Sequence, residues 1–123
     1  MMKGKRILVV EDNPVNRKLC TLQLTRMGCE TDYAETGREA VQKCLDGKFD
    51  VVLMDMQLPD LDGCSAAREI RERKKDDPNL RIIALTANAM PEDRQKCLDA
   101  GMNDYMSKPF KAETLASTLK KWM

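Results

Sequence analysis

The sequence of 123 residues contains 42% hydrophobic and 33% charged residues and carries a net charge of +1 at pH 7. These values are typical of one globular domain and exclude a collagen-like, coiled-coil or disordered chain. The sequence has no histidine, which excludes Ser/His/Asp and Cys/His catalysis, histidine zinc sites and a phosphohistidine carried by this chain. We expect a single domain over residues 1–123 in which carboxylates, hydroxyls, lysines or a hard metal ion carry the chemistry.

The five cysteines are an odd number with no C-x-x-C pair, which favours reduced, mostly buried thiols over a disulfide framework or a metal site. They are Cys20, Cys29, Cys44, Cys64 and Cys97. The basic start is followed by an apolar run at residues 7–10 that is too short for a signal peptide. No apolar stretch approaches the roughly 18 residues of a membrane span, so we expect a cytoplasmic protein without membrane contact.

Three short apolar runs, at residues 7–10, 51–54 and 82–85, are rich in branched side chains. Unbroken runs of this kind predict strands that are buried on both faces of a parallel sheet. Weaker patterns predict two further strands, around residues 29–34 and 104–107.

Helical patterns lie between these strands. The first helix is expected to begin after the capping residue Asn13, with Pro14 at its first position, and to end at Gly28. Its apolar residues follow one face of an amphipathic helix: Val15, Leu19 and Leu22. Further helices are expected from about residues 36, 63 and 91, and a last one contains residues 115–122. The residues expected to face the core in these helices are Ala40, Val41, Cys44, Leu45, Ala66, Ala67, Ile70, Leu115, Leu119 and Trp122.

Five strands that alternate with five helices predict an α/β fold, a parallel five-stranded sheet with helices on both faces. Connections that contain a helix are long enough to join parallel strands, and such connections are right-handed. No repeat, low-complexity segment or linker interrupts the pattern, so the domain is expected to fill the chain.

Polar residues follow four of the expected strands. Because parallel strands end at the same edge of a sheet, these residues are expected to lie together: Glu11, Asp12, Asp55, Thr86 and Lys108. Taken singly, each has an ordinary explanation as a helix cap, a turn residue, a loop hydroxyl or a solvated charge. Together, three carboxylates at one edge repel one another and bind protons more tightly unless a cation neutralises them. Oxygen ligands without His or Cys favour Mg²⁺.

The same residues suit the transfer of a phosphoryl group. Asp55 would be the nucleophile and would form an acyl phosphate. Mg²⁺ and Lys108 would neutralise the charge on the phosphoryl oxygens in the transition state. Thr86 would donate a hydrogen bond to an oxygen of the product.

The sequence resembles the receiver domain of two-component response regulators and hybrid histidine kinases over essentially its whole length. The resemblance rests on four motifs in order, which are ILVVEDNPVNR, DVVLMDMQLPDLDG, IIALTANAM and YMSKPF. It implies a flavodoxin-like (βα)5 three-layer sandwich with strand order 2-1-3-4-5. By this resemblance Asp55 is the phosphoacceptor and becomes 4-aspartylphosphate. The implied ligands of Mg²⁺, or alternatively of Mn²⁺, are Glu11, Asp12, Asp55 and the backbone carbonyl of Gln57.

The resemblance also assigns a conformational switch. Thr86 and Tyr105 are similar to the switch pair of receivers, and Lys108 to their phosphate-binding lysine, whose bond to Pro109 is often cis in the family. Phosphorylation adds roughly −1.5 to −2 charges, and we expect Thr86 to move to the phosphoryl oxygens while Tyr105 fills the space that it leaves. Methionines along this stretch suit either a repacking surface or an ordinary core: Met90, Met102 and Met106.

The family resemblance implies a signalling domain rather than a turnover enzyme, with self-phosphorylation and slow autodephosphorylation only. In the family, the positions that Gln57 and Asn88 occupy flank the site and modulate the lifetime of the acyl phosphate. The missing histidine belongs to the phosphodonor, a histidine kinase or a histidine phosphotransfer protein. A downstream protein partner would bind the surface formed by the fourth helix, fifth strand and fifth helix. The domain itself would be a monomer or a phosphorylation-dependent homodimer.

Two other classes of function are alternatives. A Mg²⁺-dependent phosphohydrolase of the haloacid dehalogenase type also uses an aspartate nucleophile, but it needs a second acid two residues later, where this sequence has Gln57. A flavodoxin-like cofactor-binding protein needs a phosphate-binding loop after the first strand, where Glu11 and Asp12 would repel a phosphate.

Direct binding to nucleic acid is not expected. The basic run at residues 71–75 is interrupted by Glu72 and followed by Asp76 and Asp77. Basic residues at this place favour the C-terminal end of a helix, so a solvated helix end accounts for the run.

Overall fold

The computed structural model describes residues 3–87, 90–108 and 110–123, and within them strands and helices alternate along the chain. The elements are β1 (Arg6–Val10), α1 (Pro14–Arg26), β2 (Glu30–Ala34), α2 (Gly37–Asp46), β3 (Val51–Asp55), α3 (Gly63–Arg73), β4 (Arg81–Thr86), α4 (Pro91–Asp99), β5 (Asp104–Ser107) and α5 (Ala112–Trp122). The expected alternation of five strands with five helices is confirmed. Asn88 and Pro109, which the sequence singled out, lie outside the described residues.

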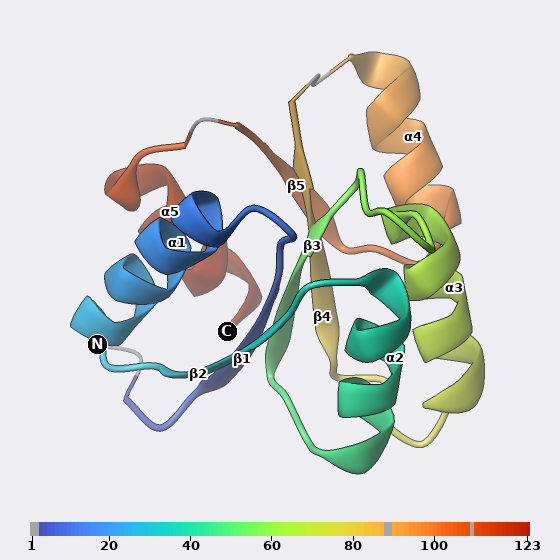
Figure 1. Ribbon diagram of the computed structural model, residues 1–123, viewed down its shortest axis with the longest axis horizontal. Coiled ribbons are helices and arrows are strands. Elements are labelled where there is room, and N and C mark those ends of the chain that lie inside the picture. Colours follow the sequence, from blue (N-terminus) through green and yellow to red (C-terminus); the bar gives the residue numbers. More distant parts are fainter. Residues whose placement is uncertain (1–2, 88–89, 109) are drawn as a thin grey trace.

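The sheet is parallel throughout, with strand order β2-β1-β3-β4-β5, which confirms the flavodoxin-like prediction. Helices α1 and α5 cover one face, and α2, α3 and α4 cover the other, so the fold has three layers (Figure 1). The central strand β3 is buried at every position, as its unbroken apolar run predicted. All strands end at one edge, and the segments after β1, β3, β4 and β5 therefore lie close together.

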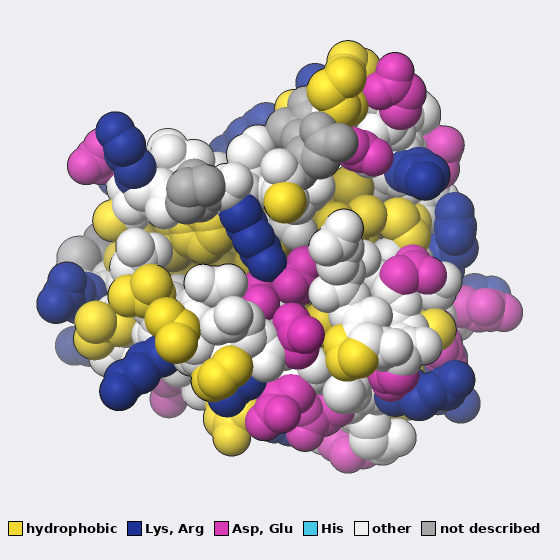
Figure 2. Space-filling model, turned by 45° about the horizontal axis from the view of Figure 1, so that its top comes forward, with side chains coloured by type: hydrophobic (Ala, Val, Ile, Leu, Met, Phe, Trp, Pro, Cys, Tyr) yellow, Lys and Arg dark blue, Asp and Glu magenta, His cyan; other side chains and the backbone are white. Residues whose placement is uncertain are grey.

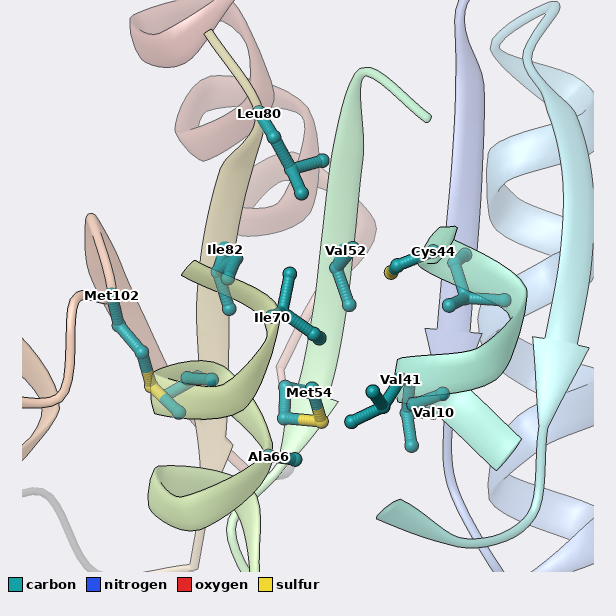
Figure 3. Close-up of a cluster of buried hydrophobic side chains, with 14 of the residues drawn as sticks. Val10, Val41, Cys44, Val52, Met54, Ala66, Ile70, Leu80, Ile82 and Met102 are labelled. Carbon is teal, nitrogen blue, oxygen red and sulfur yellow. The ribbon is translucent and has the colours of Figure 1, made fainter. Parts of the chain in front are cut away.

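The core consists of two clusters, one on each face of the sheet. The larger cluster packs α2, α3 and α4 against the strands, and Figure 3 shows the side chains of Val52, Met54 and Ile70 within it. The smaller cluster packs α1 and α5 against the opposite face, chiefly through Leu24 and Leu119. Successive side chains of each inner strand are divided between the two clusters because a strand points them to opposite faces.

The buried face of α1 differs from the one that the sequence favoured. Val15, Leu19 and Leu22 are 66%, 56% and 47% exposed, whereas Cys20 and Leu24, one turn apart, are buried. This helix has apolar residues on two faces, and the sheet covers only one of them. The predicted orientation of α1 is therefore wrong, and an apolar stripe of Val15, Leu19 and Leu22 remains on the surface.

Most other expected core residues are buried in α2, α3 and α5, with Leu45 and Trp122 only partly buried. All five cysteines are free and all but Cys64 are buried, as predicted. Met102 and Met106 are buried core residues, while Met90 is half exposed. No helix among the described residues has the length and apolar character needed to cross a bilayer.

The start of the basic run at residues 71–75 is not a solvated helix end. The side chain of Arg71 donates hydrogen bonds to the carbonyl oxygen of Gly101 at 2.8 Å and to Oδ1 of Asn103 at 2.7 Å. Asn103 Oδ1 also accepts the backbone N–H of Ile82. Arg71 therefore ties α3 to the segments that lead into β4 and β5.

Candidate functional site

Three carboxylates from two strands meet at the C-terminal edge of the sheet. Glu11 and Asp12 follow β1, Asp55 ends β3, and one oxygen of each lies within 4.8 Å of the others. Glu11 and Asp55 are buried, whereas Asp12 is exposed. The structure thus brings together the three acids that the sequence grouped, and Figure 2 shows acidic side chains gathered beside a basic one near the middle of this edge.

Lys108 links two of these carboxylates. Its Nζ atom donates hydrogen bonds to Glu11 Oε2 at 2.7 Å and to Asp55 Oδ2 at 2.9 Å. Its backbone N–H donates to the carbonyl oxygen of Thr86 at 2.7 Å, so the end of β4 fixes the start of the loop after β5. One ammonium group therefore lies between two buried acids from separate strands.

Backbone groups hold the other oxygens of these acids. The N–H of Asn13 donates to Glu11 Oε1 at 3.2 Å, and the N–H of Gln57 donates to Asp55 Oδ1 at 3.0 Å. The Nη1 atom of Arg17 donates to the carbonyl oxygen of Glu11 at 3.2 Å. Sequence reasoning missed Arg17, although a cation in the first turns of a helix that follows an acidic pair is a usable signal. The two backbone N–H contacts fix the orientation of both buried carboxylates.

The charges of the site are not balanced. Burial raises the pKa of Glu11, and the hydrogen bond from Lys108 opposes this rise without cancelling it. Burial disfavours the charge of Lys108, but its hydrogen bonds with Glu11 and Asp55 outweigh that effect, so the pKa of Lys108 is raised. One ammonium therefore serves two buried carboxylates and the exposed Asp12. Carboxylate oxygens short of positive charge fit a hard divalent cation, and these residues can hold one.

An open cavity of about 570 Å³ contains the carboxylates and Lys108. Gln57 also lines it, as does Thr86, which ends β4 and is 8% exposed. Sequence reasoning missed several other polar lining residues: Asn16, Asp62, Asp93 and Lys96. The first three lie at or near the beginnings of α1, α3 and α4, whereas Lys96 lies in the last turn of α4. An argument based on strand ends does not reach these positions.

Tyr105 lies outside this cavity. It pairs with Ala84 across β4 and β5, two residues before Thr86 on β4. Residues two apart on a strand share a face, so Thr86 and Tyr105 are diagonal neighbours on one face of the sheet. The ring packs against the larger core cluster, and the guanidinium carbon of Arg94 on α4 lies 5.7 Å from its centroid. The expected switch pair is thus adjacent, with Thr86 lining the cavity and Tyr105 beside α4.

The family model of the response regulator receiver domain matches residues 7–120. The chain is 40% identical, over 122 residues each, to the hybrid signal transduction histidine kinase L of Dictyostelium discoideum and to the sensor protein GacS of Pseudomonas syringae pv. syringae. These alignments cover 95% and 98% of this chain but only 7% and 14% of the relatives, so the chain corresponds to a small part of each.

Solved structures agree with this match. The receiver domain of a sensor histidine kinase from Pseudomonas aeruginosa PAO1, with a magnesium ion in its active site cleft, has a TM-score of 0.88 and 46% identity over 97% of both chains. The receiver domain of Ssk1 from Saccharomyces cerevisiae, in complex with the histidine phosphotransfer protein Ypd1, has a TM-score of 0.91 and 32% identity over 98% of this chain and 89% of that chain. The strand order and the match over nearly the whole chain lead to one conclusion, that this protein is a member of the response regulator receiver domain family of two-component phosphorelay signalling.

Proposed function

We propose that Asp55 accepts a phosphoryl group from a phosphohistidine on another protein or domain. An oxygen of Asp55 attacks the phosphorus, the P–N bond to the imidazole breaks with its electron pair leaving on nitrogen, and an acyl phosphate forms. The observation that supports this role most directly is the position of Lys108, whose Nζ lies 2.9 Å from Asp55 Oδ2 in the acidic cavity. An ammonium at this place neutralises charge that develops on the phosphoryl oxygens.

The same cavity would hold a divalent cation. Glu11, Asp12, Asp55 and the backbone carbonyl of Gln57 would bind Mg²⁺, or Mn²⁺ with its similar preference for oxygen ligands. When bound, the ion neutralises negative charge on the phosphoryl oxygens. The protein holds Glu11 and Asp55 in place through the N–H groups of Asn13 and Gln57, so these ligands are oriented before an ion arrives.

A slow signalling reaction is favoured over a phosphohydrolase. Gln57 lies two residues after Asp55, where a haloacid dehalogenase-type hydrolase requires an acid, and an amide does not exchange protons as a general acid or base. We propose that the acyl phosphate persists and is lost only slowly, with no turnover of phosphate esters.

The apolar stripe of α1 is the proposed contact for the phosphodonor. Val15, Leu19 and Leu22 lie on one side of the helix, and α1 begins two residues after Asp12. Exposed apolar patches on a small domain mark protein contacts. A histidine kinase domain or histidine phosphotransfer protein that packs on this stripe would place its phosphohistidine near the mouth of the acidic cavity.

The response to phosphorylation would be a change at β5 and at the two helices beside it. Thr86 would move towards the new phosphoryl oxygens, and Tyr105, its diagonal neighbour, would follow into the space that it leaves. We propose that this changes the α4-β5-α5 surface for a downstream protein or for a second copy of the domain, without direct nucleic-acid contact and within the cytoplasm.

Labelling with acetyl phosphate and Mg²⁺, read by intact mass and by hydroxylamine sensitivity, tests the assignment of Asp55. The wild type should gain one hydroxylamine-sensitive phosphoryl group and Asp55→Asn none. Asp76→Asn, which removes an exposed carboxylate in another loop, is the matched control and should label fully. Equal labelling of Asp55→Asn and wild type would refute the proposal.

Transfer from a phosphorylated phosphotransfer protein tests the contact on α1. The double variant Val15→Ser and Leu22→Ser should slow this transfer at least about tenfold while leaving labelling by acetyl phosphate unchanged, because its changes lie outside the cavity. If both donors label the variant at the wild-type rate, the stripe is not the docking surface.

A further inference from the structure

A second cavity lies next to the acidic one, between α1 and the segment that follows β5. It has a volume of about 340 Å³. Val9 and Leu85 form its floor on the sheet, Leu19 and Cys20 of α1 form one wall, and Phe110 forms another. Figure 2 shows an apolar hollow to the left of the acidic site. Leu19 also belongs to the proposed docking stripe, and Glu11 and Lys108 belong to the acidic site. The lining residues Cys20, Gln23 and Phe110 have no part in the phosphoryl transfer proposed above.

We propose that this cavity binds a small, uncharged aromatic molecule that carries one N–H or O–H group. An apolar cavity of about 150 Å³ is enough to hold benzene, and pockets for larger organic ligands begin at about 300 Å³. The volume of 340 Å³ therefore admits two fused rings. Aliphatic and aromatic side chains on three sides offer the apolar contacts that such rings need.

The charged groups at the inner end of the cavity favour an uncharged ligand. Glu11 and Lys108 line this end, and they already pair with each other at 2.7 Å. Lys108 already donates to two carboxylates, and both oxygens of Glu11 already accept hydrogen bonds within the protein. A charged ligand would lose its hydration without finding a group at this end that lacks a hydrogen-bond partner.

Gln23 supplies the reason for a hydrogen-bond donor on the ligand. Its side chain lines the cavity, and its Oε1 atom is the one enclosed side-chain oxygen or nitrogen among the described residues that accepts no hydrogen bond from another group of the protein. An enclosed acceptor without a donor is costly. Because the last torsion of glutamine is soft, the amide can turn this oxygen towards an N–H or O–H group in the cavity.

A titration with indole and with indene, its analogue without the N–H group, tests the proposal. Both are added to the metal-free protein in EDTA and followed by amide chemical shifts. Indole should shift residues of α1 and Phe110 saturably, with a Kd of about 1 mM or below. Indene should bind about fivefold more weakly, as expected for the loss of one hydrogen bond.

Three variants separate specific binding from non-specific contact. Gln23→Leu removes the acceptor and should bind indole and indene equally. Cys20→Met fills the cavity and should weaken both at least about tenfold. Leu22→Ala is the matched control, because Leu22 is on the same helix but does not line the cavity, and it should bind as the wild type does.

Shifts that do not saturate by about 5 mM indole would overturn the proposal. Equal affinity for indole and indene in the wild type would also overturn it, since Gln23 would then select nothing. If Cys20→Met fails to fold, the comparison of wild type with Gln23→Leu decides the question alone. No phosphoryl transfer takes part in this test, so its failure would leave the role proposed for Asp55 unaffected.

Discussion

Replacing Lys108 by methionine tests the electrostatic description of the site. The ammonium of Lys108 lies 2.7 Å from Glu11 Oε2 and 2.9 Å from Asp55 Oδ2, and the side chains of these acids are only 4% and 8% exposed. Methionine keeps most of the length and apolar volume of lysine but removes the charge. The variant therefore leaves two buried carboxylates facing each other without a cation.

The expected loss of stability is limited by proton uptake. Removing one partner of a buried ion pair costs about 3–5 kcal/mol, but a carboxyl group can take up a proton instead. For a glutamate with an ordinary pKa of about 4.3, protonation costs about 3.7 kcal/mol at pH 7 and about 1 kcal/mol at pH 5. The pKa of Glu11 is already raised by burial, so the actual costs are smaller. We expect Lys108→Met to lose about 2–3 kcal/mol at pH 7 and less than about 1 kcal/mol at pH 5.

The sign of this pH dependence follows from proton binding. In the variant, the folded state holds a carboxyl proton that the unfolded state has released, so the free energy of unfolding falls as pH rises from 5 to 7. In the wild type, Lys108 stays charged and stabilising at pH 5 and at pH 7, because both pH values lie well below the ordinary lysine pKa of 10.5 and the pKa of Lys108 is raised further. The raised pKa of Glu11 also makes the wild type lose some stability as pH rises. Removing Lys108 removes the hydrogen bond and the charge that oppose this rise, so the pKa of Glu11 is higher still in the variant and the difference between variant and wild type widens with pH.

Urea unfolding followed by circular dichroism at pH 5 and pH 7, in EDTA, measures this difference. Lys18→Met removes an exposed lysine of α1 and should change the free energy of unfolding by less than about 0.5 kcal/mol at either pH. A loss for Lys108→Met that is equal at both pH values, or that is below about 1 kcal/mol at pH 7, would refute the reasoning.

Two further predictions concern packing, and both are measured by urea unfolding. Leu24→Ala should destabilise the domain by about 2–5 kcal/mol, because Leu24 is fully buried between α1 and the sheet. Leu22→Ala on the exposed face of α1 should cost less than about 1 kcal/mol. Similar losses for the two variants would mean that α1 is oriented differently. Gly37→Ala should cost about 2 kcal/mol, because its Cβ would overlap the carbonyl oxygen of Leu61, while Gly47→Ala meets only ordinary contacts. A neutral Gly37→Ala would show that this close approach is absent.

The acidic site could be grouped from the sequence because its members follow strands. A continuous apolar run marks a buried parallel strand, and the end of each such strand is placed at one edge by the fold itself. This argument alone was enough to group three acids at that edge, which are Glu11, Asp12 and Asp55. Asn16 and Lys96 could not be found in this way, because they reach the cavity from helices whose rotation the strand pattern does not specify.

Helix α1 shows why some features depend on tertiary structure. Its sequence places apolar residues on two faces, and local spacing makes Leu19 as suitable for the core as Leu24. The sheet covers only one face of a helix that lies on it, and the total apolar burial along α1 and α5 selects the face that contains Leu24.

The sequence by itself determined the alternation of strands and helices, the parallel sheet and the set of acids at its edge, because these follow from periodicity and chain direction within short segments. The tertiary structure decided which face of α1 is exposed, that Lys108 joins Glu11 to Asp55, and that a second cavity opens beside them. These features depend on side chains from distant segments meeting at specific distances. Such distances result from the packing of the whole core, which no local pattern encodes.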